Sequence, residues 1–231
     1  MPSERGVTFL ELIIAITLVA AIVAGLLFAM RGSMLTYEKV NGRLEEDTRL
    51  LRMTQALERQ IGGTIAIMGA CGAAGRVPVF NGDAQSLRFV SSYSLEEGAR
   101  GYARLVEYQV APDPKSAPQG GVRLMMNERI YAGPATTAPL CANNVFLPVE
   151  IDAQSIEAVG RLAYCRMSYR EFVPDNLPAG HWMIVWNRPA LPGAVRIEMA
   201  PLTGSEPSLP VMSLNVPIHI FRELGVQYED N

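Results

Sequence analysis

The sequence contains few of the residues on which metal, nucleophilic and nucleic-acid chemistry depend. Its 231 residues include 3 cysteines, 2 histidines and 2 tryptophans. The histidines, His181 and His219, stand in no spacing with each other or with cysteine that forms a zinc site. The formal net charge of -3 provides no broad basic field for phosphates. No nucleic-acid partner is therefore expected.

Catalytic motifs are equally scarce. The chain has no G-x-S-x-G elbow, phosphate-binding loop or dinucleotide fingerprint. Residues 81–85 and 174–182 carry oxygen ligands without the spacing of an EF-hand, and we interpret them as turns. Trp182 and Trp186 flank β-branched residues typical of a strand, so they are predicted to pack in a core. We expect no catalytic residue, metal or cofactor, and predict that the protein is not an enzyme.

What the sequence does contain is one long apolar run near its start. Residues 12–30 carry no charge, and a helix of this length spans roughly 28 Å, enough for the hydrocarbon core of a bilayer. The run is too long for a cleaved secretory signal, and residues 28–31 fit a small-residue cleavage site poorly. A retained membrane helix is therefore predicted. Arg5 precedes it and Arg31 follows it, so charge alone leaves its orientation undecided.

Glu11 stands at the edge of this apolar run, where an ionised carboxylate is costly without a partner. The hexapeptide GVTFLE at residues 6–11, followed by the apolar run, resembles the signature of prepilins. The resemblance implies that a prepilin peptidase removes a leader, residues 1–6, by cutting between Gly6 and Val7, and that the new amine of Val7 is methylated. It also implies that Glu11 pairs with such an amine during assembly. Alternatively, Glu11 marks the interfacial end of an ordinary anchor, which leaves Gly6 and the hydrophilic leader unexplained.

The rest of the chain divides into a second helical stretch and a strand-rich region. After the membrane segment, residues 7–30, apolar residues at intervals of three, four and seven predict that the helix continues over residues 31–63 and stops at Gly62 and Gly63. Residues 64–231 form short runs separated by glycine and proline, typical of strands. The expected strands are residues 86–91, 104–110, 121–127, part of 158–172, 181–186, 194–199 and 216–221. We therefore predict an α+β fold, a long helix packed on an antiparallel sheet as in pilins.

The three cysteines permit one disulfide if the strand-rich region lies in an oxidising periplasm. The sequence does not decide the pair. We favour Cys71 with Cys141, because both lie in glycine-rich or loop-like contexts, whereas Cys165 lies within an expected strand.

A narrower resemblance comes from the carboxyl-terminal half. The order of RLVEYQV, GVRLMMNE, IEAVGRLAYCRMSYREF, the two tryptophans and LPGAVRIEM resembles the J-type minor pseudopilins of type II secretion systems. It implies a single-pass inner-membrane protein with a periplasmic domain that joins other pseudopilins at the tip of a pseudopilus. An inner-membrane platform extends such a pseudopilus to export folded proteins. The alternatives are a minor pilin of a type IV pilus and, from another class, a signal-anchored periplasmic enzyme or ligand-binding domain.

Overall fold

The computed structural model describes residues 9–72, 75–116, 118, 120–143, 145–173, 180–202 and 212–219, and excludes the side chains of residues 35–36 and 38–50. The chain forms two compact units, Met1–Leu51 and Arg52–Asn231. The first consists, in its described part, of helix α1, which runs from Phe9 to Gly62 and enters the second unit at Arg52.

The end of α1 is fixed by glycines and a hydroxyl group. The amide of Gly63 donates to the carbonyl of Arg59 at 2.9 Å, and the Thr64 hydroxyl donates to the carbonyl of Ile61 at 2.6 Å. A Cβ atom at Gly63 would lie 2.9 Å from the Ser91 hydroxyl oxygen and 3.0 Å from the Arg59 carbonyl oxygen. Only glycine fits this close approach of the helix end to the sheet, and the predicted stop at residues 62–63 is confirmed.

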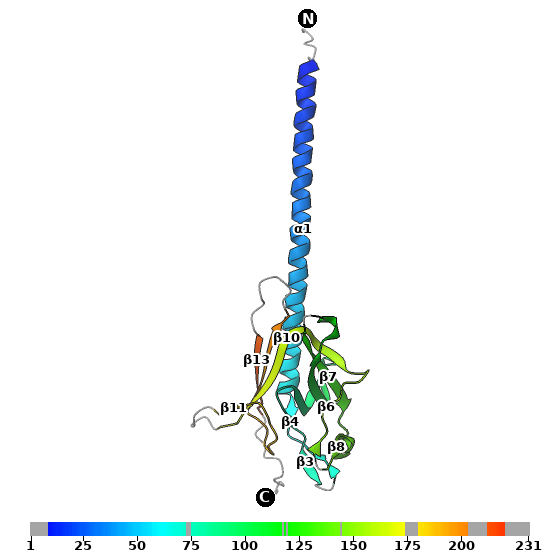
Figure 1. Ribbon diagram of the computed structural model, residues 1–231, viewed down its shortest axis with the longest axis vertical. Helices are drawn as coiled ribbons and strands as arrows, with labels where there is room; N and C mark the ends of the chain where they lie inside the picture. Colours follow the sequence, from blue (N-terminus) through cyan, green and yellow to red (C-terminus); the bar gives the residue numbers. More distant parts are fainter. Residues whose placement is uncertain are drawn as a thin grey trace. The chain divides into compact units, whose positions relative to one another are not determined.

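Antiparallel strands form a large sheet in the second unit (Figure 1). Its order is β1-β5-β6-β7-β10-β12-β13, while β4 pairs with β5 and β11 pairs with β10. The strands are β1 (Thr64–Ile65), β4 (Asn81–Gly82), β5 (Ser86–Ser94), β6 (Ala99–Pro112), β7 (Val122–Ile130), β10 (Ile156–Arg170), β11 (Trp182–Met183), β12 (Ala194–Pro201) and β13 (Met212–Pro217). The predicted α+β class with an antiparallel sheet is confirmed.

Two expected strands differ from the structure. The segment predicted at residues 181–186 is split: β11 ends at Met183, and Trp186 instead exchanges backbone hydrogen bonds of 2.8 and 3.0 Å with Gly82. Pairing with two different neighbours forces the chain to turn between them. The strand predicted at residues 216–221 overlaps β13 only at Val216 and Pro217: β13 runs from Met212 to Pro217, Ile218 and His219 lie beyond its end, and residues 220–221 lie outside the described part of the chain.

The two faces of the sheet bury different clusters. One face packs on the end of α1, where Leu57 and Ile61 meet Phe89, Val106 and further core residues of β7, β10, β12 and β13. Phe89 pairs with Val106 on this face. The next pair along the two strands, Val90 with Leu105, places its side chains on the opposite face of the sheet. Val90 and Leu105 pack with Val79 in a second, smaller cluster on the other face.

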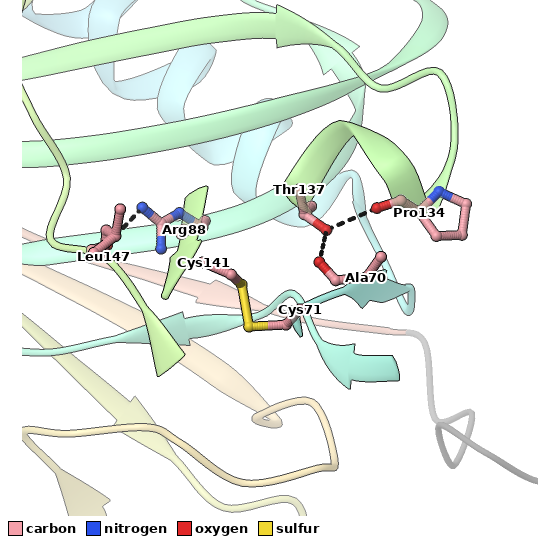
Figure 2. The surroundings of a disulfide bond; sticks show 7 residues. All are labelled: Ala70, Cys71, Arg88, Pro134, Thr137, Cys141 and Leu147. Atoms are coloured by element: carbon pink, nitrogen blue, oxygen red, sulfur yellow. Dashed lines mark hydrogen bonds between the residues drawn. A yellow bond between two sulfur atoms is a disulfide. The ribbon is translucent and has the colours of Figure 1, made fainter. Parts of the chain in front are cut away.

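A small layer of irregular elements covers this second cluster. We call it the outer layer; it comprises β2 (Met68–Ala70), β3 (Arg76–Pro78), the 3₁₀ helix η3 (Pro134–Leu140), β8 (Cys141–Ala142) and β9 (Val145–Phe146). Figure 2 shows the disulfide between Cys71 and Cys141 that joins its two halves. Beside it, the Thr137 hydroxyl lies 3.0 Å from the carbonyl of Ala70, to which it donates.

Candidate functional site

The first candidate site is the apolar surface of α1. Residues Phe9–Met34 form a helix long and apolar enough to cross a membrane, with a mean hydropathy of 2.9. Its large side chains are exposed, for example Leu18 at 59% and Phe28 at 84%. Water solvates such a surface poorly, so this segment requires lipid or other apolar helices around it.

The helix surface also has the small residues that allow another helix to approach closely. A shallow apolar groove runs along it, lined by Ala15, Ile16, Val19, Ala20, Val23, Ala24 and Leu27. The one hydroxyl within residues 15–27, that of Thr17, donates to the carbonyls of Ile13 and Ile14 at 3.0 and 2.9 Å. Because the hydroxyl is satisfied within the helix, this surface remains compatible with hydrocarbon.

Glu11 lies in the first turn of α1, beside exposed Phe9 and Leu10. Gly6 and Val7, the residues of the expected cleavage and methylation, lie outside the described residues. The structure thus provides the position of Glu11 but no geometry for the expected cut.

A buried polar cluster ties the end of α1 to the sheet, and the sequence analysis did not identify it. Gln60, fully buried, donates through Nε2 to the Glu128 carboxylate at 3.0 Å and accepts from the Tyr108 hydroxyl through Oε1. Glu128 also accepts from the Leu95 amide at 2.9 Å and from the Ser94 hydroxyl. Burial, and to a lesser extent Glu128, raise the pKa of Tyr108, so its hydroxyl remains a donor. The sequence feature that could have indicated this cluster is the polar Gln60 on the same helix face as the apolar Leu57 and Ile61.

The cysteines separate into a bonded pair and a buried thiol. Cys71 and Cys141, the pair that the sequence analysis favoured, form the disulfide of the outer layer. Cys165 is free and lies in β10, where burial raises the pKa of its thiol to about 12. A protonated, enclosed thiol is a poor nucleophile, so Cys165 acts as a core residue.

The remaining polar candidates lie apart from one another. His219 is exposed at the end of β13, and Asp83 closes a turn by accepting from the amides of Gln85 and Ser86 at 2.7 and 2.8 Å. Residues 174–179 of the other turn lie outside the described chain. Among the described residues, no three or more histidine, cysteine, aspartate or glutamate side chains gather as metal ligands.

The two tryptophans have different environments. Trp186 is 2% exposed, and its indole Nε1 donates to the carbonyl of Ala190 at 2.9 Å, so the predicted core role is confirmed for this residue. For Trp182 the prediction was wrong. Its ring is partly exposed and stacks with Arg170 and Arg196 on the outer face of the sheet.

Comparison with known proteins adds no relative from which a function can be transferred. No protein-family model matches the sequence, and no curated protein matches it.

Proposed function

We propose that this protein is a minor pseudopilin of a type II secretion system, a structural subunit without catalytic activity. The observation that carries the proposal is the exposed apolar helix Phe9–Met34, whose first described residues, Phe9 to Glu11, are the last three of the hexapeptide GVTFLE. An isolated membrane anchor has no need of a carboxylate there. In a subunit that moves from lipid into a helical assembly, Glu11 selects the axial offset at which it meets a neighbouring amine.

The second unit supports the same proposal. Its sheet packs on the end of α1, the arrangement expected of a pilin-like head. The strands that carry the J-type resemblance, β6, β7, β10 and β12, are consecutive neighbours in the sheet. The Cys71–Cys141 disulfide is typical of an oxidising compartment, which favours a periplasmic location for this unit.

Mass spectrometry of the amino-terminal peptide tests the proposal. In cells that contain a prepilin peptidase, the membrane-extracted protein should begin at N-methylated Val7. In cells without it, the protein should retain residues 1–6. A chain that keeps its original start in both strains would overturn the proposal and favour a signal-anchored periplasmic protein.

The partners distinguish a pseudopilin from a minor pilin of a type IV pilus, because the two share the amino-terminal signature. We expect the processed protein to copurify with other minor and major pseudopilins and with the inner-membrane platform. Copurification with pilins of a surface pilus would instead support the alternative.

A further inference from the structure

The face of the sheet opposite α1, here called the outer face, has one half covered by other elements of the chain and one half without such a layer among the described residues. Over β5 and β6 it is covered by the outer layer, beneath which Val90 and Leu105 are buried. Over β10, β12 and β13 most of its outward residues are polar, charged or aromatic. We call this second half the arginine face; its members are Tyr164, Arg166, Ser168 and Arg170 of β10, Trp182 of β11, Arg196 and Glu198 of β12, and Ser213 and Asn215 of β13.

A stack of side chains holds the centre of this face in place. The guanidinium carbon of Arg196 lies 3.8 Å from the centroid of the Trp182 ring, and that of Arg170 lies 5.5 Å from it. Arg196 is further fixed by donating through Nε to the Asn215 side-chain oxygen at 2.8 Å. A guanidinium held by one edge and one face presents its two terminal nitrogens as a rigid fork, the geometry that binds a carboxylate through two hydrogen bonds.

The charge of the face is opposite to that of the whole chain. Arg166, Arg170 and Arg196 outnumber Glu198, whereas the protein carries a formal net charge of -3. Arg166 is exposed. Arginine and aromatic residues are enriched at protein interfaces and lysine is depleted there, and the face contains no lysine.

Exposed apolar residues flank the arginines. Tyr164 is 36% exposed on β10, and Ile184 and Val185, directly after β11, are 68% and 51% exposed. The face thus combines fixed positive charge with apolar margins. A bilayer surface provides negative charge without matching groups for Glu198, Ser213 and Asn215, whereas a folded protein surface can match each in register.

We propose that the arginine face is a docking surface for another protein, through a segment that presents carboxylates beside apolar side chains. Arg166, Arg170 and Arg196 bind the carboxylates, and Tyr164 packs against the neighbouring apolar groups. The surface lies entirely in the Arg52–Asn231 unit, so it does not depend on processing of the amino terminus.

Photo-crosslinking from the full-length protein in its own cells tests this proposal. The photoreactive analogue p-benzoylphenylalanine replaces Tyr164 on the face or, as a matched control, Tyr102, which is 80% exposed on β6. We expect Tyr164→p-benzoylphenylalanine to give an adduct with a different protein, whose crosslinked peptide contains aspartate or glutamate. The amino-terminal peptide is measured in the same samples, so loss of the adduct and loss of processing are read separately.

Charge changes then test the chemistry of the adduct. Arg166→Glu should lower its yield by about tenfold or more, and Arg100→Glu, a reversal at an exposed position of β6, should leave it unchanged. Ser213 is exposed opposite Glu198, so Ser213→Glu should also lower the yield and Ser213→Lys should maintain or raise it.

Several outcomes would overturn the proposal. These are an adduct within the same chain or with a second copy of it, an adduct with lipid, a yield no higher than that from Tyr102, and equal yields from Ser213→Glu and Ser213→Lys in proteins with unchanged thermal unfolding.

Discussion

At the scale of single residues, Gln60 fixes the end of α1 to the sheet through both its side chain and its backbone. Its side-chain amide bridges Glu128 of β7 and Tyr108 of β6, and its backbone carbonyl accepts from the Ser91 hydroxyl of β5 at 2.7 Å. The helix end is therefore held to three strands by directional bonds as well as by apolar packing.

Replacing this amide should be costly. Gln60→Leu leaves the Glu128 carboxylate and the Tyr108 hydroxyl each short of a buried partner, so the free energy of unfolding should fall by about 2 to 4 kcal/mol. Gln55→Leu is the matched control, because Gln55 lies exposed on the same helix. Urea unfolding of both variants in detergent, followed by tryptophan fluorescence, measures the difference. Equal midpoints would show that the polar cluster contributes little.

Cys165 makes stability depend on pH in the alkaline range. Burial raises the pKa of its thiol from 9.0 to about 12, so the unfolded chain loses this proton at lower pH than the folded chain does. The unfolded state is therefore favoured as pH rises through 9, and this contribution to stability should fall by up to about 1.4 kcal/mol per pH unit until about pH 12.

Cys165→Ala removes this dependence. Between pH 9 and 10, below the usual pKa of tyrosine, the variant should lose less unfolding free energy than the original protein does. Urea titrations at pH 7, 9 and 10 test this expectation, and the comparison at pH 7 corrects for the lost side-chain volume. Parallel pH profiles of the two proteins would contradict it.

At the scale of elements, the outer layer depends on its disulfide more than on its own packing. Its apolar cluster is small, with Val79, Val90 and Leu105 as its buried members. Below it, Arg88 and Glu107 form a buried ion pair at 2.6 Å, and Arg88 also donates to the carbonyl of Leu147 at 2.9 Å. Displacing the layer would hydrate this pair and break the hydrogen bond to Leu147.

Removal of the disulfide should loosen this layer selectively. Replacing Cys71 and Cys141 with serine opens a link across 70 residues, and the free energy of unfolding should fall by about 3 to 4 kcal/mol. Amide exchange should accelerate in β2, β3, η3 and β8, while β10 and β12 remain protected. Cys165→Ala is the cysteine control. Uniform acceleration in all strands would show that the layer and the sheet unfold together.

A bulge in β10 places a non-glycine residue, Arg161, in the left-handed backbone conformation. Arg161 has φ of 55°, and its register shift lies between Val159 and Leu162. Its amide donates to the Asp113 carboxylate at 3.2 Å, and its carbonyl accepts from the Leu202 amide at 2.7 Å, so the backbone is held on both sides. These bonds maintain a left-handed conformation that arginine disfavours.

Glycine at this position should stabilise the protein. Arg161→Gly relieves the left-handed strain and should raise the free energy of unfolding by about 1 kcal/mol, whereas Arg166→Gly, in the regular part of β10, should lower it by about as much. Thermal unfolding of the two variants gives opposite shifts if this holds. A decrease for Arg161→Gly would mean that its side chain contributes more than the strain removes.

At the scale of the whole molecule, the parts that follow one repeating pattern were predictable. The apolar run, the helix stop at Gly62 and Gly63, and strands such as β12, where Val195, Ile197 and Met199 alternate with polar residues, each leave a local signature. The outer layer leaves no such signature, because its short elements are separated by glycines and prolines and are joined by a disulfide between residues 70 positions apart. The Trp182 stack and the partners of Gln60 come from strands far apart in the sequence, so beyond the polar Gln60 on an apolar helix face no local pattern indicates them.

The division into two units predicts where the chain can be cut. A protein that begins at Arg52 keeps Leu57, Gln60 and Ile61, the residues through which α1 completes the core and the buried polar cluster, and loses the exposed apolar surface of Phe9–Met34. We expect it to be soluble without detergent, to unfold cooperatively and to retain the Cys71–Cys141 disulfide.

A protein that begins at Gly63 lacks the side chains of the helix end and exposes the apolar face of the sheet, so it should aggregate or unfold at a much lower temperature. Size-exclusion chromatography and calorimetry of the two proteins measure this, and equal stability would show that the sheet does not need the helix end.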